Sequence, residues 1–108
     1  MSHYPINRGL IQDTAKTSGA DFFATDLSPK FSPSTFRIMI SVDTATRLSA
    51  TIENDSTEMT AHFNAGVDLT ADCLYIFDLL VHQGDTVNFE VDDTVNVDIC
   101  RVQEIDFP

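Results

Sequence analysis

Apolar and polar residues alternate along most of the chain after residue 35, with the two-residue period that is typical of β-strands. The clearest case is FRIMISV (residues 36–42), in which Phe36, Ile38, Ile40 and Val42 fall on one face. The same pattern predicts further strands at residues 47–53, 58–64, 73–81, 86–91 and 94–105, with 21–27 (DFFATDL) as a candidate seventh. The chain is therefore predicted to consist mainly of strands.

Short polar segments separate these strands and carry residues that favour turns. NDST (residues 54–57) contains Asn and Asp, whose side chains bond their own backbone and tolerate a left-handed conformation. HQGD (residues 82–85) contains a glycine, which supplies the positive φ of a tight hairpin loop. Residues 36–53 are likewise predicted to form a hairpin. The inward positions of the last strand change parity, which predicts a β-bulge near Cys100 and Arg101.

These elements predict an all-β fold, an antiparallel, jelly-roll-like β-sandwich of about six to eight strands. A chain of 108 residues has room for one core, so we expect one sandwich domain at residues 21–108. Residues 1–20 are polar and weakly patterned, and Pro5 and Gly9 interrupt any regular element. They are predicted to form an extended N-terminal arm.

The strand predicted at residues 73–81 is apolar on both faces, which indicates that both faces are covered. Its even-numbered positions carry three large apolar side chains besides Asp78, and we expect that face to be covered by the N-terminal segment or by another subunit. The N-terminal arm is also expected to reach a neighbour. The predicted interface residues are Tyr4, Ile6, Leu10, Ile11, Leu74, Ile76 and Leu80.

Acidic residues outnumber basic ones by 17 to six, which gives a formal net charge of −11. A surface of that sign repels phosphate groups, and no basic patch interrupts the sequence, so we expect neither nucleic-acid binding nor docking on an anionic membrane. Lysine occurs only at Lys16 and Lys30, and aspartate is abundant. Halophilic proteins use such a surface, and a salt-rich environment is a hypothesis for this chain.

The first residues, MSHYPINRGLIQ, lack an apolar core of signal-peptide length, and no stretch approaches the ~18 apolar residues of a membrane span. We therefore expect a soluble protein. Cys73 and Cys100 leave two alternatives open: a disulfide between neighbouring strands, or two buried thiols.

His82 and Asp85 lie three residues apart, a spacing that also occurs in metal and acid–base sites. We interpret them as parts of a turn, because no second histidine stands at a ligand spacing from His82. Asp78 lies among apolar residues, where a carboxylate needs a partner or acquires a raised pKa. We expect it to be exposed or paired with an arginine, and the candidates are Arg37, Arg47 and Arg101.

Acidic residues cluster in EVDDTVNVD (Glu90, Asp92, Asp93 and Asp98), and carboxylates of this kind bind calcium. The run lacks the register of an EF-hand loop, and DD between two strands is interpreted as a solvated hairpin turn. No G-x-S-x-G elbow, Cys-His constellation or glycine-rich phosphate loop is visible. We therefore expect no cofactor, no metal and no catalytic residue.

The segment from Phe63 to Ile105 combines three features: F-N-x-G-x-x-L-x-A, x-G-D-T-V-N-F and a final V-x-V-x-x-x-R-V-x-E-I strand. In this succession it resembles small β-sandwich virion proteins of tailed bacterial and archaeal viruses, over about residues 60–106. The resemblance carries no catalytic motif. It implies a jelly-roll-like subunit that forms homo-oligomers on a capsid, neck or tail.

The sequence thus predicts a non-enzymatic virion structural protein that acts through contacts with copies of itself and with other virion proteins. Two alternatives are left open. One is a β-sandwich module that binds carbohydrate or calcium, and the other is a small hydrolase that uses Asp78.

Overall fold

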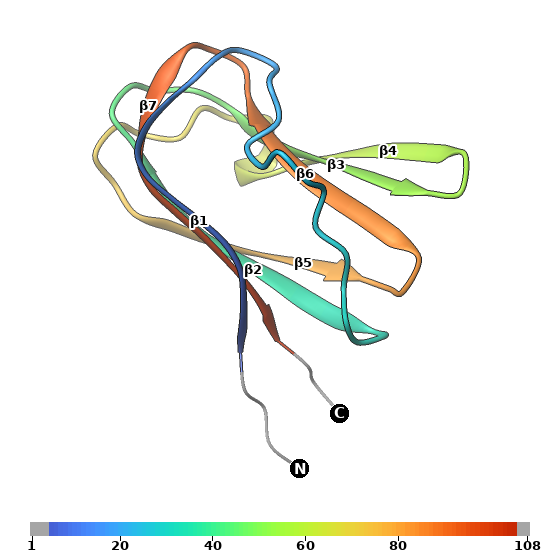
Figure 1. Ribbon diagram of the computed structural model, residues 1–108. Coiled ribbons are helices and arrows are strands. Elements are labelled where there is room, and N and C mark those ends of the chain that lie inside the picture. Colours follow the sequence, from blue (N-terminus) through green and yellow to red (C-terminus); the bar gives the residue numbers. More distant parts are fainter. Residues whose placement is uncertain (1–4, 106–108) are drawn as a thin grey trace.

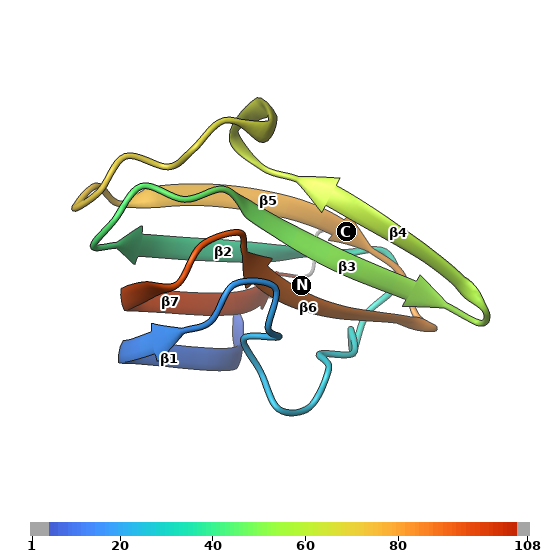
Figure 2. The ribbon, with the colours of Figure 1, turned by 90° about the horizontal axis from the view of Figure 1, so that it is seen from above.

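The computed structural model, described here for residues 5–105, is an antiparallel β-sandwich of two sheets (Figures 1 and 2). The four-stranded sheet has the order β1 (Ile6–Lys16), β7 (Val95–Ile105), β2 (Ser34–Val42) and β5 (Tyr75–Val81). The three-stranded sheet has the order β4 (Thr57–His62), β3 (Leu48–Asn54) and β6 (Asp85–Val91), and a short 3-10 turn, η1, spans Asn64–Gly66. The predicted all-β sandwich is confirmed.

Strands that are consecutive in the chain often lie in different sheets of this sandwich. The turn at Asp55, which has a φ of 54°, joins the hydrogen-bonded neighbours β3 and β4 as a hairpin. The predicted hairpin at residues 36–53 is wrong, because β2 and β3 belong to different sheets. The turns after β5 and after β6 also cross between the sheets, so neither is a hairpin. Alternation along a strand reports which side faces the core, and it carries no information about the neighbouring strand.

Most of the predicted N-terminal arm is the edge strand β1, which pairs with β7 from Ile6 to Lys16. The predicted extended arm is therefore not confirmed for residues 6–16, which belong to the sandwich. Figures 1 and 2 both show β1, in blue, lying beside β7, in red. Only Ile11 of this strand is buried, which explains why its sequence shows so little alternation.

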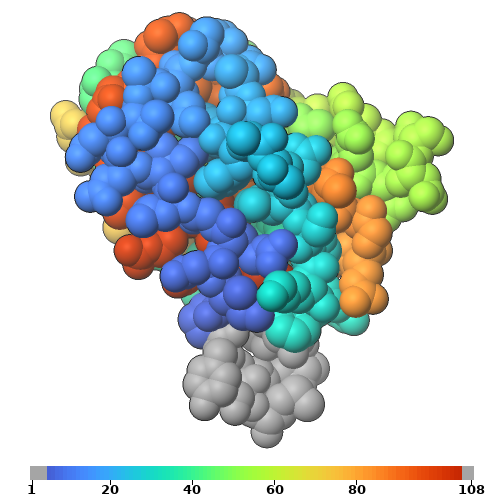
Figure 3. Space-filling view, in the orientation of Figure 1, coloured from blue at the N-terminus to red at the C-terminus, as the bar shows by residue number. Residues whose placement is uncertain are grey.

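Residues 19–27 run along the free edge of β6. Backbone hydrogen bonds join Gly19 N–H to the Val91 carbonyl and Leu27 to Val87 in both directions, each at 2.8 Å. The candidate strand at residues 21–27 is therefore reduced to a single bridge, between Leu27 and Val87. A jelly roll has eight strands, and this segment takes the place of the one that would follow β1 in the chain and pair with the free edge of β6. Figure 3 shows it in light blue and cyan, between β1 and the yellow-green hairpin of β3 and β4.

The predicted bulge in the last strand lies slightly earlier than expected. Ser41 faces Ile99 and Val42 faces Val97, so Asp98 is left without a partner on β2. Beyond this bulge Cys100 turns inward, where it is fully buried.

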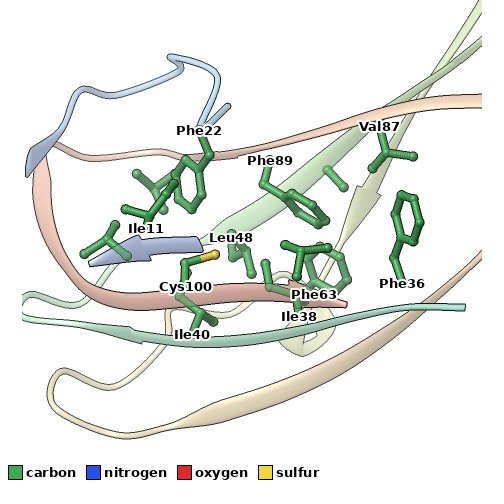
Figure 4. Close-up of a cluster of buried hydrophobic side chains, with 14 of the residues drawn as sticks. Ile11, Phe22, Phe36, Ile38, Ile40, Leu48, Phe63, Val87, Phe89 and Cys100 are labelled. Carbon is green, nitrogen blue, oxygen red and sulfur yellow. The ribbon is translucent and has the colours of Figure 1, made fainter. Parts of the chain in front are cut away.

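The core consists of side chains from the inner faces of both sheets (Figure 4). Phe36, Ile38 and Ile40 of β2 are completely buried and lie opposite β3 and β6. Phe89 of β6 packs 6.2 Å from the Phe63 ring, measured between centroids. Burying a side chain of this size contributes about 1.5–3 kcal/mol, so these positions dominate the stability of the sandwich.

Two buried polar side chains hold the long connection between β1 and β2. Asn88 of β6 accepts the N–H of Phe23 at 3.0 Å and donates to the Phe23 carbonyl and to Asp26, both at 2.8 Å. Asn88 is buried, although its place in the alternation predicts the outside. The second anchor is Glu104 of β7, which is completely buried.

The Glu104 carboxylate accepts three hydrogen bonds through one oxygen. They come from the backbone N–H groups of Lys30 at 2.6 Å and Phe31 at 3.0 Å, and from the Ser34 hydroxyl at 2.9 Å. Its other oxygen lies 3.8 Å from Arg8 Nε, on the neighbouring strand β1. One carboxylate thus ties the start of β2 and the preceding segment to the four-stranded sheet.

Candidate interaction surface

The outer face of β5 exposes large apolar side chains. Leu74, Ile76 and Leu80 are 61%, 56% and 63% exposed. Together they form what is called here the β5 strip. Such side chains are common singly on a surface, but two on β5 and a third at the residue just before it form a row that is typical of a contact site. The structure thus places the three C-terminal residues of the predicted interface together.

Asp78, in the middle of the β5 strip, is paired with Arg37 on the adjacent strand β2. Arg37 Nε lies 2.8 Å from one carboxylate oxygen, and its terminal nitrogen lies 3.0 Å from the other. These hydrogen bonds hold the pKa of Asp78 below its usual range. The predicted arginine partner is confirmed, and the only charge within the strip is balanced by its neighbour.

The inner side of β5 is also only partly covered. Tyr75, Phe77 and Leu79 are half-buried at the margin of the core. The Tyr75 and Phe77 rings are stacked with centroids 5.8 Å apart, and Phe77 packs 5.1 Å from Phe63. Both sides of β5 therefore retain apolar surface that a neighbour would remove from water.

The predicted N-terminal interface residues do not stay together. Tyr4 lies outside the described residues. Ile6 is half-buried opposite Glu104, and Ile11 belongs to the chain's own core. Leu10 is 55% exposed and pairs with Arg101, so it shares the outer face of the four-stranded sheet with the β5 strip. A contact at Leu10 stays a prediction.

The HQGD segment forms a turn, as predicted. Gly84 has a φ of 94°, and Asp85 caps the turn by accepting the N–H of His82 at 2.9 Å and the side-chain amide of Asn54 at 2.7 Å. Both hydrogen bonds lower the pKa of Asp85, and the one from Asn54 has the larger effect. Among residues 5–105, no three His, Cys, Asp or Glu side chains are placed to hold a metal ion.

The acidic side chains of residues 90–98 do not gather at one site. Asp92 pairs with Arg47, and Asp98 accepts the side-chain amide of Asn96 at 3.0 Å. Glu90 instead faces a shallow concavity on the three-stranded sheet.

That concavity, of about 320 Å³, is lined mainly by polar side chains of β3, β4, β6 and residues 21–26. Its acidic residues are Asp21, Asp26, Glu53, Glu58 and Glu90. Glu53 and Glu58 face each other across β3 and β4, and the hydrogen bond and repulsion between them raise the pKa of Glu53. This surface is therefore strongly negative, in contrast to the charge-balanced β5 strip.

The two cysteines are free thiols in different environments. Cys73 is exposed just before β5, whereas Cys100 lies in the core. Burial raises the pKa of the Cys100 thiol to about 12. Neither of the predicted alternatives holds as stated, because only one of the thiols is buried.

Within the part of the chain that the structure describes, no helix is long and apolar enough to cross a membrane. Comparisons with family models, curated proteins and solved structures found no match for this chain. The function is therefore argued from the surface itself.

Proposed function

We propose that this chain is a non-enzymatic structural subunit that works through contacts with copies of itself and with neighbouring proteins. The observation that carries the proposal is the β5 strip, in which Leu74, just before the strand, and Ile76 and Leu80 within it expose more than half of their surface. Covering apolar surface stabilises an assembly by about 25 cal/mol per Å². A contact through this strip therefore removes three large exposed apolar side chains from water.

The acidic residues that drew attention in the sequence have structural partners. Asp78 is bound by Arg37, and Asp85 holds the turn between β5 and β6. Arg47 is likewise paired, with Asp92, so it adds no free positive charge for a phosphate group. These pairings support a role in binding protein surfaces more than one in catalysis or nucleic-acid recognition.

The setting we propose is a virus particle, in a decoration, neck or tail position. The support is the resemblance of residues 60–106 to small β-sandwich virion proteins, together with an acidic surface that tolerates high salt. The β-sandwich suits such a role, since its two faces separate an apolar contact surface from a charged one.

The assembly is expected to depend on salt. Each chain carries a formal charge of −11, so copies repel one another at low ionic strength and the repulsion is screened in molar salt. Size-exclusion chromatography with light scattering, in 1 M and in 20 mM salt, tests this. We expect a discrete multiple of the 12.0 kDa chain in high salt and a smaller species in dilute buffer. A 12.0 kDa monomer in both buffers would count against the proposal.

A further inference from the structure

Three of the four sheet edges are protected against pairing with another strand. Residues 19–27 cover the edge of β6 with backbone hydrogen bonds. The edge strand β1 carries Arg8 and Lys16, and its register shifts between Asn7 and Gly9. The edge strand β4 presents the exposed Glu58. Charges and irregular register are usual ways in which proteins block an edge.

The fourth edge, that of β5, has none of these protections. Within residues 5–105, β2 is the only strand that pairs with β5. The strand YIFDLLV is regular over its whole length, and Asp78, its one charged residue, is already bound by Arg37. An apolar edge of this kind is a template for another strand.

We propose that this edge pairs with β5 of a second copy of the chain, antiparallel and with Phe77 on the twofold axis. This inference rests on the proposed function, and it identifies the contact through which two copies of the chain associate. In this register Leu74 faces Leu80 of the second copy, twice by symmetry, and Ile76 faces Asp78. The two four-stranded sheets then become one sheet, joined through an isologous contact.

The register follows from the side chains of β5. Centring the pair on Asp78 would place two carboxylates opposite each other, and like charges directly opposite are destabilising. Centring it on Ile76 would place Leu74 opposite Asp78 and Leu80 opposite Asp72. The register centred on Phe77 joins the two most exposed leucines and opposes no two acids.

The inner side of the strand supports the same partner. In this register Phe77 meets its own copy, and Tyr75 meets Leu79, so the half-buried residues of β5 face apolar partners. The strand is thus complementary to itself on both sides. A contact through β5 also keeps the acidic concavities of the two copies out of the interface, so their clustered carboxylates do not face each other.

Disulfide trapping tests the register. The first variant carries Leu74→Cys and Leu80→Cys, with Cys73→Ser to remove the exposed native thiol. The two new cysteines are about 20 Å apart along one strand, so a disulfide between them joins two chains. The matched control carries Ile76→Cys, Leu80→Cys and Cys73→Ser. In the proposed register its cysteines lie diagonally, about 7–8 Å apart, beyond ready disulfide reach.

Under mild oxidation in 1 M salt we expect the first variant to become a covalent dimer on a non-reducing gel, at least tenfold faster than the control. Equal rates, or faster trapping of the control, would overturn the register centred on Phe77. Trapping of neither variant, when light scattering shows that the unmodified protein associates, would overturn the β5 contact and leave the proposed function standing. An unmodified protein that is monomeric in 1 M salt would overturn both.

Discussion

Replacing Glu104 with alanine is expected to destabilise the sandwich by about 3–5 kcal/mol, the cost of breaking a buried charged network by removing one partner. The side chain is completely buried and accepts hydrogen bonds from Lys30, Phe31 and Ser34. Alanine leaves the buried Ser34 hydroxyl and the two partly buried backbone N–H groups without this acceptor, and it leaves Arg8 without its carboxylate. Small domains have ~5–15 kcal/mol of total stability, so this loss approaches the whole margin.

Urea unfolding followed by circular dichroism measures this effect. Glu58→Ala is the matched control, because Glu58 is exposed and lies opposite Glu53, so its removal relieves repulsion. Glu104→Gln keeps one oxygen acceptor and is expected to fall between the two. A loss below about 1 kcal/mol for Glu104→Ala would contradict the role of this carboxylate as the anchor of the segment before β2.

Replacing Ile76 with aspartate is expected to weaken self-association by about tenfold while leaving the subunit folded. Ile76 is 56% exposed, so the isolated subunit accommodates a carboxylate in contact with water. In the register proposed above the same carboxylate faces Asp78 of the second copy, and this contact occurs twice by symmetry. Like charges directly opposite on paired strands cost up to about 1 kcal/mol per pair, so the two contacts correspond to about a tenfold change.

The matched control for Ile76→Asp is Met59→Asp. Met59 is exposed to a similar degree, 52%, but lies on β4 of the other sheet, and the substitution adds the same charge. Sedimentation velocity over a range of concentrations gives the association constants, and thermal unfolding verifies that both variants fold. Equal weakening of association in the two variants would show that added charge, and not the β5 strip, governs assembly.

The parts of this account that depend on alternation could be predicted from the sequence. Ile76 and Leu80 of β5, and Leu74 just before it, are exposed together in the structure, as the alternation of residues 73–81 predicts. The pairing of strands was beyond such prediction, because alternation is a property of one strand whereas pairing depends on contacts distant in sequence. The strand β1 was missed for a related reason: as an edge strand it has only one buried residue, Ile11.

The two buried polar anchors were also missed. Asn88 bonds to Phe23 across 65 positions, and Glu104 bonds to Lys30 across 74, so nothing local marks either role. One signal was available for Glu104. Cys100, Val102 and Glu104 lie two positions apart, so they share one face of the strand. If Cys100 faces the core, the Glu104 carboxylate does too, and a buried carboxylate needs hydrogen-bond donors.

The central claim is that β5 is the contact between copies, and hydrogen–deuterium exchange tests it most directly. Exchange of the unmodified protein in 1 M salt is compared at concentrations well below and well above the midpoint of association. The account predicts that backbone amides of β5, Tyr75–Val81, become at least tenfold more protected in the assembled protein. The amides of β4, Thr57–His62, which is an edge strand of the three-stranded sheet, are expected to stay unchanged. Unchanged protection of β5 in a protein that associates would contradict the claim and place the contact elsewhere.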